Sequence, residues 1–140
     1  EPNEDRNWAD ISIEYLDGIV QEYGPFYGIL GYSQGCPMAT VYIANSNTSF
    51  EKAFLFNGYL PTTHSGLNDT INEVAPLDVD ALIFGGDNDV FIFGVEELEG
   101  VYQEPTIIIS STADHHLPFS DDETYGDVLA FFRQGTNGTL

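Results

Sequence analysis

Short apolar runs that alternate with stretches of helical spacing constrain the fold of this chain more than any other feature. Each run is four or five residues long and bounded by glycine or polar turn residues, as buried strands are. Between the runs, apolar residues recur at intervals of three and four, which is typical of helices packed on a sheet. This alternation favours an α/β domain with a parallel sheet over an all-helical or all-β one. The expected strands are residues 26–30, 53–56, 81–84 and Thr106–Ser110.

The segments between these runs predict four helices. In the first, Ile11, Tyr15, Ile19 and Tyr23 recur every four residues, which indicates an amphipathic helix that Gly24-Pro25 ends. Residues 60–76 contain Pro, Thr, His, Gly and Asn, and predict a long loop or an irregular excursion. The expected helices are residues 8–23, 35–44, 94–102 and 124–132.

Composition limits the function classes open to this chain. It has 140 residues, a formal net charge of −20 and only three cations, Arg6, Lys52 and Arg133. A surface this negative repels phosphate backbones and anionic lipids, so we expect neither nucleic-acid nor membrane binding. The single cysteine, Cys36, excludes an internal disulfide and a thiolate zinc site.

The length and the first residues bear on organisation and location. At 140 residues we expect one domain, 1–140, with a single core of moderate size. The N-terminal residues EPNEDRNW do not resemble a signal peptide, which favours a cytoplasmic location. Secretion stays open, because the N-terminus need not be that of the whole protein.

The sequence Gly31-Tyr32-Ser33-Gln34-Gly35 is a G-x-S-x-G motif between an expected strand and an expected helix. A nucleophilic serine in such a motif projects from a tight, strained turn, so the positions two before and two after it must be nearly free of side chains. The helix that follows directs its backbone N–H groups and positive dipole end at the reaction centre. The alternative is a glycine-rich turn without a catalytic role.

A serine nucleophile needs a base, and the base needs a carboxylate that orients it. Of the three histidines, His115 and His116 directly follow an expected strand, where a catalytic base would lie, whereas His64 falls in the polar loop. A glycine turn after another expected strand carries Asp87 and Asp89, and position alone leaves both open as the acid.

The same side chains could in principle form a carboxylate–imidazole metal site, because Asp, Glu and His are metal ligands. No ligand spacing on one helical face supports such a site. We therefore expect no metal and no cofactor. The residues considered for this site are Asp87, Asp89, Asp114, His115 and His116.

At these motifs the chain resembles the FSH family of serine hydrolases, small α/β-hydrolases found widely in fungi and other eukaryotes. Residues 24–35, GPFYGILGYSQG, are similar to the family's GPFDGILGFSQG. Residues 86–89 resemble its G-x-x-D and residues 115–118 resemble its H-x-V-P, so the resemblance implies Ser33 as nucleophile, Asp89 as acid and His115 as base. Residues 113–114 are Ala-Asp where the family has Gly-Gly.

The resemblance also implies a fold and an oxyanion hole. The backbone N–H of Gln34 would be one oxyanion donor, with Gly31 and Gly35 as the glycines of the nucleophile turn. Several strands precede the nucleophile strand in the family, but only residues 1–25 precede it here. The expected fold is therefore a partial α/β-hydrolase fold, a parallel sheet flanked by helices that lacks the N-terminal strands and the loop that supplies the second donor.

These observations predict a serine hydrolase that cleaves a small-molecule carboxylic ester or thioester through an acyl-enzyme. One alternative is a non-catalytic, truncated fragment that associates with a partner or with its own copy through the exposed sheet edge. Another is an enzyme of the carboxylesterase and acyl-protein thioesterase group, which shares a similar GFSQG segment. The sequence does not identify the natural substrate.

Overall fold

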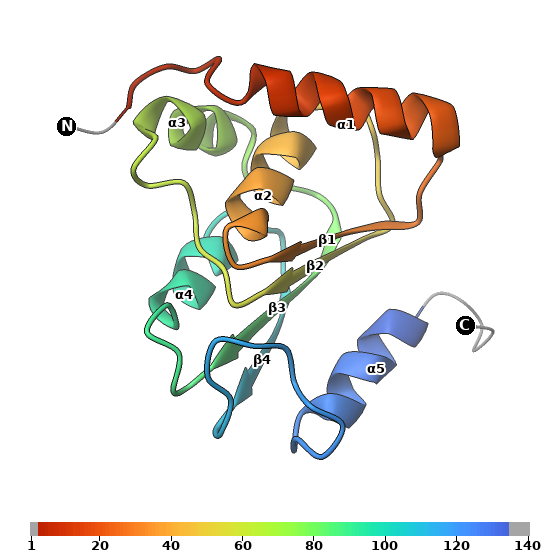
Figure 1. Cartoon of the computed structure of the whole chain (residues 1–140), viewed down its shortest axis with the longest axis vertical. Coiled ribbons are helices and arrows are strands. Elements are labelled where there is room, and N and C mark those ends of the chain that lie inside the picture. Colours follow the sequence, from red (N-terminus) through yellow and green to blue (C-terminus); the bar gives the residue numbers. More distant parts are fainter. Residues whose placement is uncertain (1–2, 135–140) are drawn as a thin grey trace.

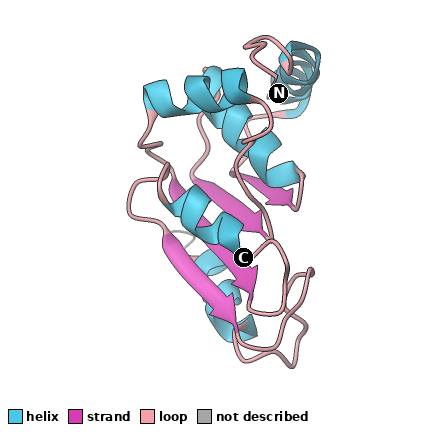
Figure 2. Ribbon diagram, turned by 90° about the vertical axis from the view of Figure 1, so that its left-hand side faces the viewer, coloured by secondary structure: helices cyan, strands magenta, loops and turns pink. Residues whose placement is uncertain are grey.

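Four parallel strands lie side by side in the order in which they occur in the chain, with helices on both faces of their sheet (Figures 1 and 2). The computed structural model describes residues 3–134. The strands are β1 (Gly28–Tyr32), β2 (Lys52–Phe56), β3 (Asp80–Gly86) and β4 (Thr106–Ser110). The helices are α1 (Asp10–Tyr23), α2 (Gly35–Asn45), α3 (Ser65–Val74), α4 (Phe93–Glu99) and α5 (Tyr125–Arg133). The predicted parallel sheet with flanking helices is confirmed.

The two central strands hold most of the core, because side chains that alternate along each strand reach both faces of the sheet. Leu55 of β2 and Ile83 of β3 belong to the cluster beneath α2, α3 and α4. Their neighbours Phe54 and Phe84 belong to a second cluster on the opposite face, where α5 contributes Phe131. Strands buried on both faces need near-continuous apolar sequences, which is why these runs were recognisable.

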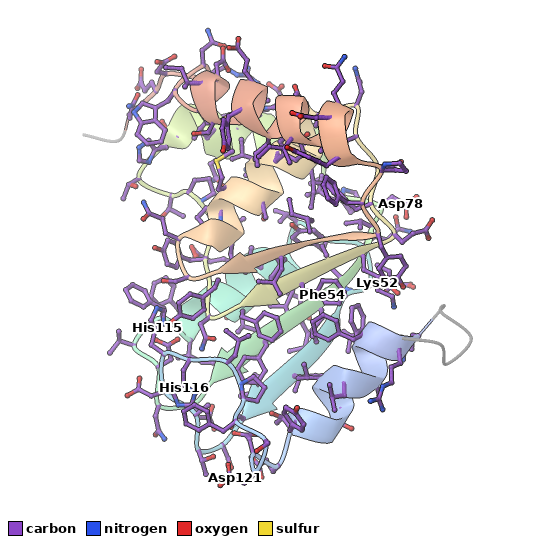
Figure 3. All side chains as sticks on the ribbon, turned by 45° about the vertical axis from the view of Figure 1, so that its right-hand side comes forward. Lys52, Phe54, Asp78, His115, His116 and Asp121 are labelled. Carbon is purple, nitrogen blue, oxygen red and sulfur yellow. The ribbon has the colours of Figure 1, made fainter. Side chains whose placement is uncertain are left out.

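Lys52 is a buried cation at the amino end of β2. Its Nζ lies 2.6 Å from Asp80 Oδ2, at the start of β3, and 4.0 Å from the ring centroid of Phe131. The ion pair and the aromatic ring together compensate for the removal of the charge from water. Figure 3 shows Lys52 at one end of the sheet and His115 at the other, so Lys52 stabilises the fold away from the candidate site.

The sheet edge that carries the G-x-S-x-G motif differs from the prediction. Residues 26–30 were expected to form a buried strand, but β1 is an edge strand that pairs only with β2 among the described residues. Leu30 is 52% exposed and Tyr32 is 41% exposed. The expected helix α1 also forms, yet none of its residues is fully buried, and Ile11 and Tyr15 of its apolar stripe face solvent.

The prediction of a loop over residues 60–76 is wrong, because α3 lies within it. Leu67 and Ile71, one turn apart on this helix, are both buried in the core. Arg6 also fixes the helix from outside, with hydrogen bonds to Thr70 Oγ1 and an ion pair to Glu73. None of the described helices is long and apolar enough to cross a membrane.

Candidate active site

Ser33 occupies the sharp turn between β1 and α2 that the motif predicts. Its φ is 54°, in a left-handed region that residues other than glycine seldom adopt. Two backbone hydrogen bonds fix the turn: the Ser33 N–H donates to the Phe56 carbonyl at 2.9 Å, and the Ser33 carbonyl accepts the Cys36 N–H at 3.0 Å. Such backbone strain is concentrated at functional sites, where the surrounding structure holds it.

The turn requires glycine at one of the two expected positions. A Cβ on Gly31 would lie 2.6 Å from the Gly35 carbonyl oxygen and 2.9 Å from Cys36 Cα, closer than real Cβ contacts allow. A Cβ on Gly35 would meet no atom within 4 Å, so the expected steric requirement is wrong for Gly35. Gly58, which the sequence analysis did not single out, is required instead, because a Cβ there would collide with the Cys36 side chain.

The carboxyl ends of three strands bring Ser33, His115 and Asp89 into contact. The distance from Ser33 Oγ to His115 Nε2 is 2.8 Å, and the distance from His115 Nδ1 to Asp89 Oδ2 is also 2.8 Å. Because an ionised carboxylate only accepts hydrogen bonds, His115 donates its Nδ1–H to Asp89 and leaves Nε2 free to accept the serine hydroxyl. This is the geometry in which an imidazole can take a proton from a serine.

Asp89 is held in its ionised form by three donors. Its side chain is 1% exposed. Burial opposes ionisation, but hydrogen bonds from the Phe91 N–H, from His115 and from Asn57 outweigh it, and the pKa of the Asp89 carboxyl is below its usual value. Asp87, the other candidate acid, is exposed in the same turn. The structure thus brings Asp89, and not Asp87, to the imidazole.

Asn57 is a site residue that the sequence analysis missed. It follows β2 with a φ of 55° and is 2% exposed. Its Nδ2 donates to Asp89 Oδ2 and to the Asp114 carbonyl, both at 3.2 Å, and so links the acid to the residue before His115. The Asn-Gly pair at the strand end marks a left-handed turn, because asparagine tolerates that backbone conformation. The contact with Asp114 depends on a loop far along the chain, and no local pattern reveals it.

Two aromatic residues fix the position of His115. The Tyr32 hydroxyl donates to the His115 carbonyl at 2.6 Å, and the two rings lie 5.3 Å apart. On another side the Phe91 ring lies 5.2 Å from the imidazole. His116 does not join the site: its ring stacks on Phe119 at 4.2 Å. Of the two adjacent histidines, the structure thus brings His115 to Ser33 and Asp89, the histidine that the resemblance implied.

The first residues of α2 offer a donor for an anion. No atom of the described part of the chain accepts the Gln34 N–H, which immediately follows Ser33 at the positive end of the helix. Cys36, close by, is fully buried, and burial raises the pKa of its thiol to about 12, so it is not a nucleophile at neutral pH. His64 lies apart from the triad, with its ring 4.3 Å from that of Trp8.

The described residues contain no group of three or more His, Cys, Asp or Glu side chains arranged to hold a metal ion. Asp89 and His115, two residues considered for such a site, bind each other instead.

Known proteins resemble this chain along most of its length. The family described as "Serine hydrolase (FSH1)" matches residues 1–125. Esterase FUS5 of Gibberella fujikuroi is 28% identical over 126 residues, which cover 88% of this chain and 53% of the esterase. The chain thus spans about half the length of this curated relative.

Solved structures show the same fold. A monoacylglycerol lipase from Paleococcus ferrophilus superimposes with a TM-score of 0.68 at 12% identity, over 89% of this chain and 73% of the lipase. Esterase PE8 superimposes with a TM-score of 0.66 at 19% identity, over 89% of this chain and 59% of the esterase. The four-stranded sheet is therefore part of an α/β-hydrolase fold, as the resemblance implied.

Proposed function

Because this chain belongs to the serine hydrolase (FSH1) family, we propose that it cleaves a carboxylic ester or thioester through an acyl-enzyme formed on Ser33. The observation that carries the proposal is the continuous row of hydrogen bonds from Ser33 Oγ through His115 to Asp89, each 2.8 Å long. Nucleophile, base and orienting acid then have the geometry of a triad.

In the first half of the reaction, Ser33 Oγ attacks the carbonyl carbon of the substrate while His115 Nε2 takes the hydroxyl proton. Asp89 stabilises the imidazolium that forms and holds the ring in the tautomer that can accept the proton. His115 then gives the proton to the leaving alcohol or thiol, and the acyl group stays on Ser33. Because the pKa of Asp89 is below its usual value, this carboxylate stays ionised throughout.

In the second half, water takes the place of the alcohol. His115 accepts a proton from the water, which attacks the acyl carbon, and then returns the proton to Ser33 Oγ as the acid leaves. In both halves the oxyanion would bind the free N–H of Gln34. Loss of one oxyanion donor costs on the order of 10² to 10³ in rate, so a site with Gln34 as its only donor would turn over slowly.

The net charge of the protein limits the class of ester that it is expected to bind. With a net charge of −20, the surface disfavours anionic substrates and suits a neutral or cationic ester.

A fluorophosphonate probe tests the proposal directly, because it reacts covalently with an activated serine. The purified protein should be labelled at Ser33, as identified by peptide mass spectrometry, and Ser33→Ala should abolish labelling. Ser120→Ala, at an exposed serine of the loop before α5, is the matched control and should leave labelling unchanged. A folded protein that is not labelled would support the non-catalytic alternative, for which the open edge of β1 is the structural basis.

A further inference from the structure

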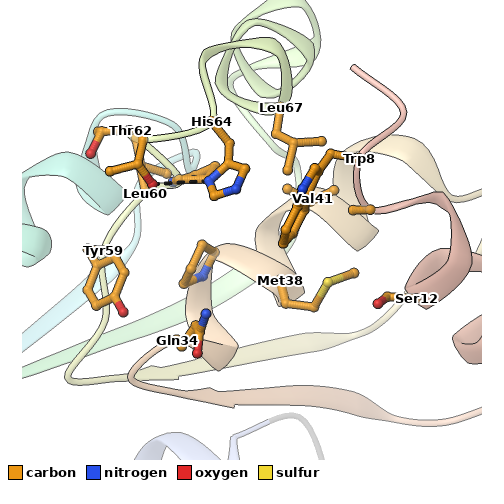
Figure 4. Close-up of a pocket in the computed structure, with 14 residues that line it drawn as sticks. Trp8, Ser12, Gln34, Met38, Val41, Tyr59, Leu60, Thr62, His64 and Leu67 are labelled. Atoms are coloured by element: carbon orange, nitrogen blue, oxygen red, sulfur yellow. Dashed lines mark hydrogen bonds between the residues drawn. The ribbon is translucent and has the colours of Figure 1, made fainter. Parts of the chain in front are cut away.

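A cavity of about 410 Å³ lies beside the candidate active site, in the range of small-molecule pockets (Figure 4). Its walls come from the segment before α1, the first turns of α2, the loop after β2 and the start of α3. We call it the Trp8 pocket. Its apolar walls include Trp8, Met38, Leu60 and Leu67.

The pocket reaches the candidate active site at Gln34, the residue that follows Ser33 in the chain. Gln34 is one of its lining residues, whereas neither Ser33 nor His115 is. His115 must protonate the leaving group, so the leaving group lies on the imidazole side of the carbonyl. The acyl part of the substrate then extends past Gln34, toward the pocket.

The chemistry of the walls selects an uncharged group. None of the described lining residues is Asp, Glu, Lys or Arg. The titratable side chains that line it are those of Tyr59 and His64. The His64 Nδ1 is hydrogen-bonded to Thr63 Oγ1 at 3.0 Å, and the His64 ring packs against Trp8. A carboxylate in the pocket would have no cation to pair with and would lose its hydration, which is costly.

We propose that the Trp8 pocket holds the acyl chain of the substrate, so that the protein prefers esters of uncharged aliphatic acids of medium length. This inference rests on the proposed hydrolase function. At roughly 30 Å³ for a group the size of a water molecule, the volume accommodates a chain on the order of ten carbons. Each methylene transferred from water into the pocket should raise kcat/KM by about three- to fourfold until the pocket is filled.

A series of p-nitrophenyl esters from acetate to dodecanoate tests this preference. We expect kcat/KM to rise with chain length up to about octanoate and then level off. Met38→Trp, which places a larger side chain in the pocket, should lower the octanoate-to-acetate ratio of kcat/KM about tenfold or more. Val74→Trp is the control: Val74 is on the exposed side of α3, outside the pocket, and its variant should keep the wild-type ratio.

Trp8 gives a second readout, because it is the only tryptophan of the chain and lines the pocket. A trifluoromethyl ketone with an eight-carbon chain, which adds reversibly to an activated serine, should change the Trp8 fluorescence. Trifluoroacetone, which lacks the chain, should not.

The outcomes separate the two proposals. A flat chain-length profile with fluorophosphonate labelling of Ser33 intact would overturn the role of the pocket and leave the hydrolase proposal standing. An equal fall in acetate and octanoate activity in Met38→Trp would also overturn it. No labelling of Ser33 in a folded protein would overturn the hydrolase proposal and the acyl-pocket proposal together.

Discussion

Two regions of the sheet, the strands β3 and β4 and the edge strand β1, supply different parts of the candidate site and are supported to different degrees. Asp89 and His115 follow β3 and β4, where the acid is almost fully buried and receives hydrogen bonds from Asn57 and Phe91. Ser33 follows β1, an edge strand with an exposed Leu30. Asp89 is therefore enclosed by the described chain and His115 is 31% exposed, whereas Ser33 lies at the end of an edge strand.

The proposed reaction needs two separate sets of contacts, those that orient His115 and those that bind the oxyanion. The contacts that orient His115 come from Asp89, Tyr32 and Phe91, all within the described residues. On the β1 side, the Gln34 N–H has no acceptor among the described residues and is the donor proposed for the oxyanion. We therefore expect strong effects from substitution of Asp89 and of buried side chains of β3, and weak ones from exposed side chains of β1 such as Leu30.

The largest expected effect is that of Asp89→Asn. Without the carboxylate, His115 loses the partner that fixes its tautomer and stabilises its positive charge, and we expect kcat for ester hydrolysis to fall by roughly 10⁴-fold. Asp87→Asn, two residues away at an exposed position, should stay within about twofold of wild type. Steady-state kinetics on one ester measure both variants, and equal losses would contradict the assignment of Asp89.

A second pair of substitutions compares the strands themselves. Leu82 of β3 is 0% exposed, so Leu82→Ala should lower the free energy of unfolding by about 2–5 kcal/mol. Leu30→Ala should lower it by less than about 0.5 kcal/mol, because half of this side chain already faces solvent. Urea denaturation followed by circular dichroism gives both values. A large loss at Leu30 would mean that another chain covers the β1 edge in solution.

The sequence predicted the elements whose residues carry their own signal. Thr106–Ser110 was predicted with the bounds that β4 has, because a run of β-branched residues favours a buried strand. The motif and its place after a strand indicated Ser33, whereas strand-end position left Asp87 and Asp89, and His115 and His116, as alternatives, and the resemblance to the family chose Asp89 and His115. The helix α3 was missed because it contains weak helix formers such as Asn68 and Asp69. With only two buried apolar side chains, Leu67 and Ile71, its helical spacing was not recognised.

Other features depend on contacts that no local pattern contains. The spacing of Ile11 and Tyr15 predicts an apolar helix face, but spacing does not say what covers that face, and in α1 both residues are exposed. The burial of residues 26–30 was overestimated for the same reason, since an apolar run fits an edge strand as well as a central one. Asn57 was missed because its partners lie 32 and 57 residues away in the chain.

Asn57 allows the support of the acid to be weakened without removing the acid. Asn57→Gly keeps the left-handed turn, since glycine adopts it readily, but removes both hydrogen bonds. We expect kcat to fall by about 10- to 100-fold, the loss of one or two charge-assisted hydrogen bonds that position a catalytic group.

Glu104→Gly is the matched control for this substitution. Glu104 also has a positive φ, 46°, but lies exposed in the loop before β4. Its replacement changes the backbone in the same way and should leave kcat unchanged. A similar loss in the two variants would assign the effect of Asn57→Gly to the backbone.

The smallest expected effect is a pH dependence of stability that belongs to Asp89. Its pKa is lower in the folded protein than its usual value of about 3.9, because the hydrogen bonds favour the ionised form despite burial. Asp89 therefore stabilises the fold above about pH 4, and this contribution is lost as the pH falls through the folded pKa.

Asp89→Asn has no carboxylate to titrate at this position. The difference in the free energy of unfolding between wild type and Asp89→Asn should be constant near neutral pH and shift against the wild type as the pH falls below about 4. Because the other carboxylates titrate alike in both proteins, subtraction isolates Asp89, and a difference that stays constant down to pH 2 would show that its hydrogen bonds do not favour the ionised form.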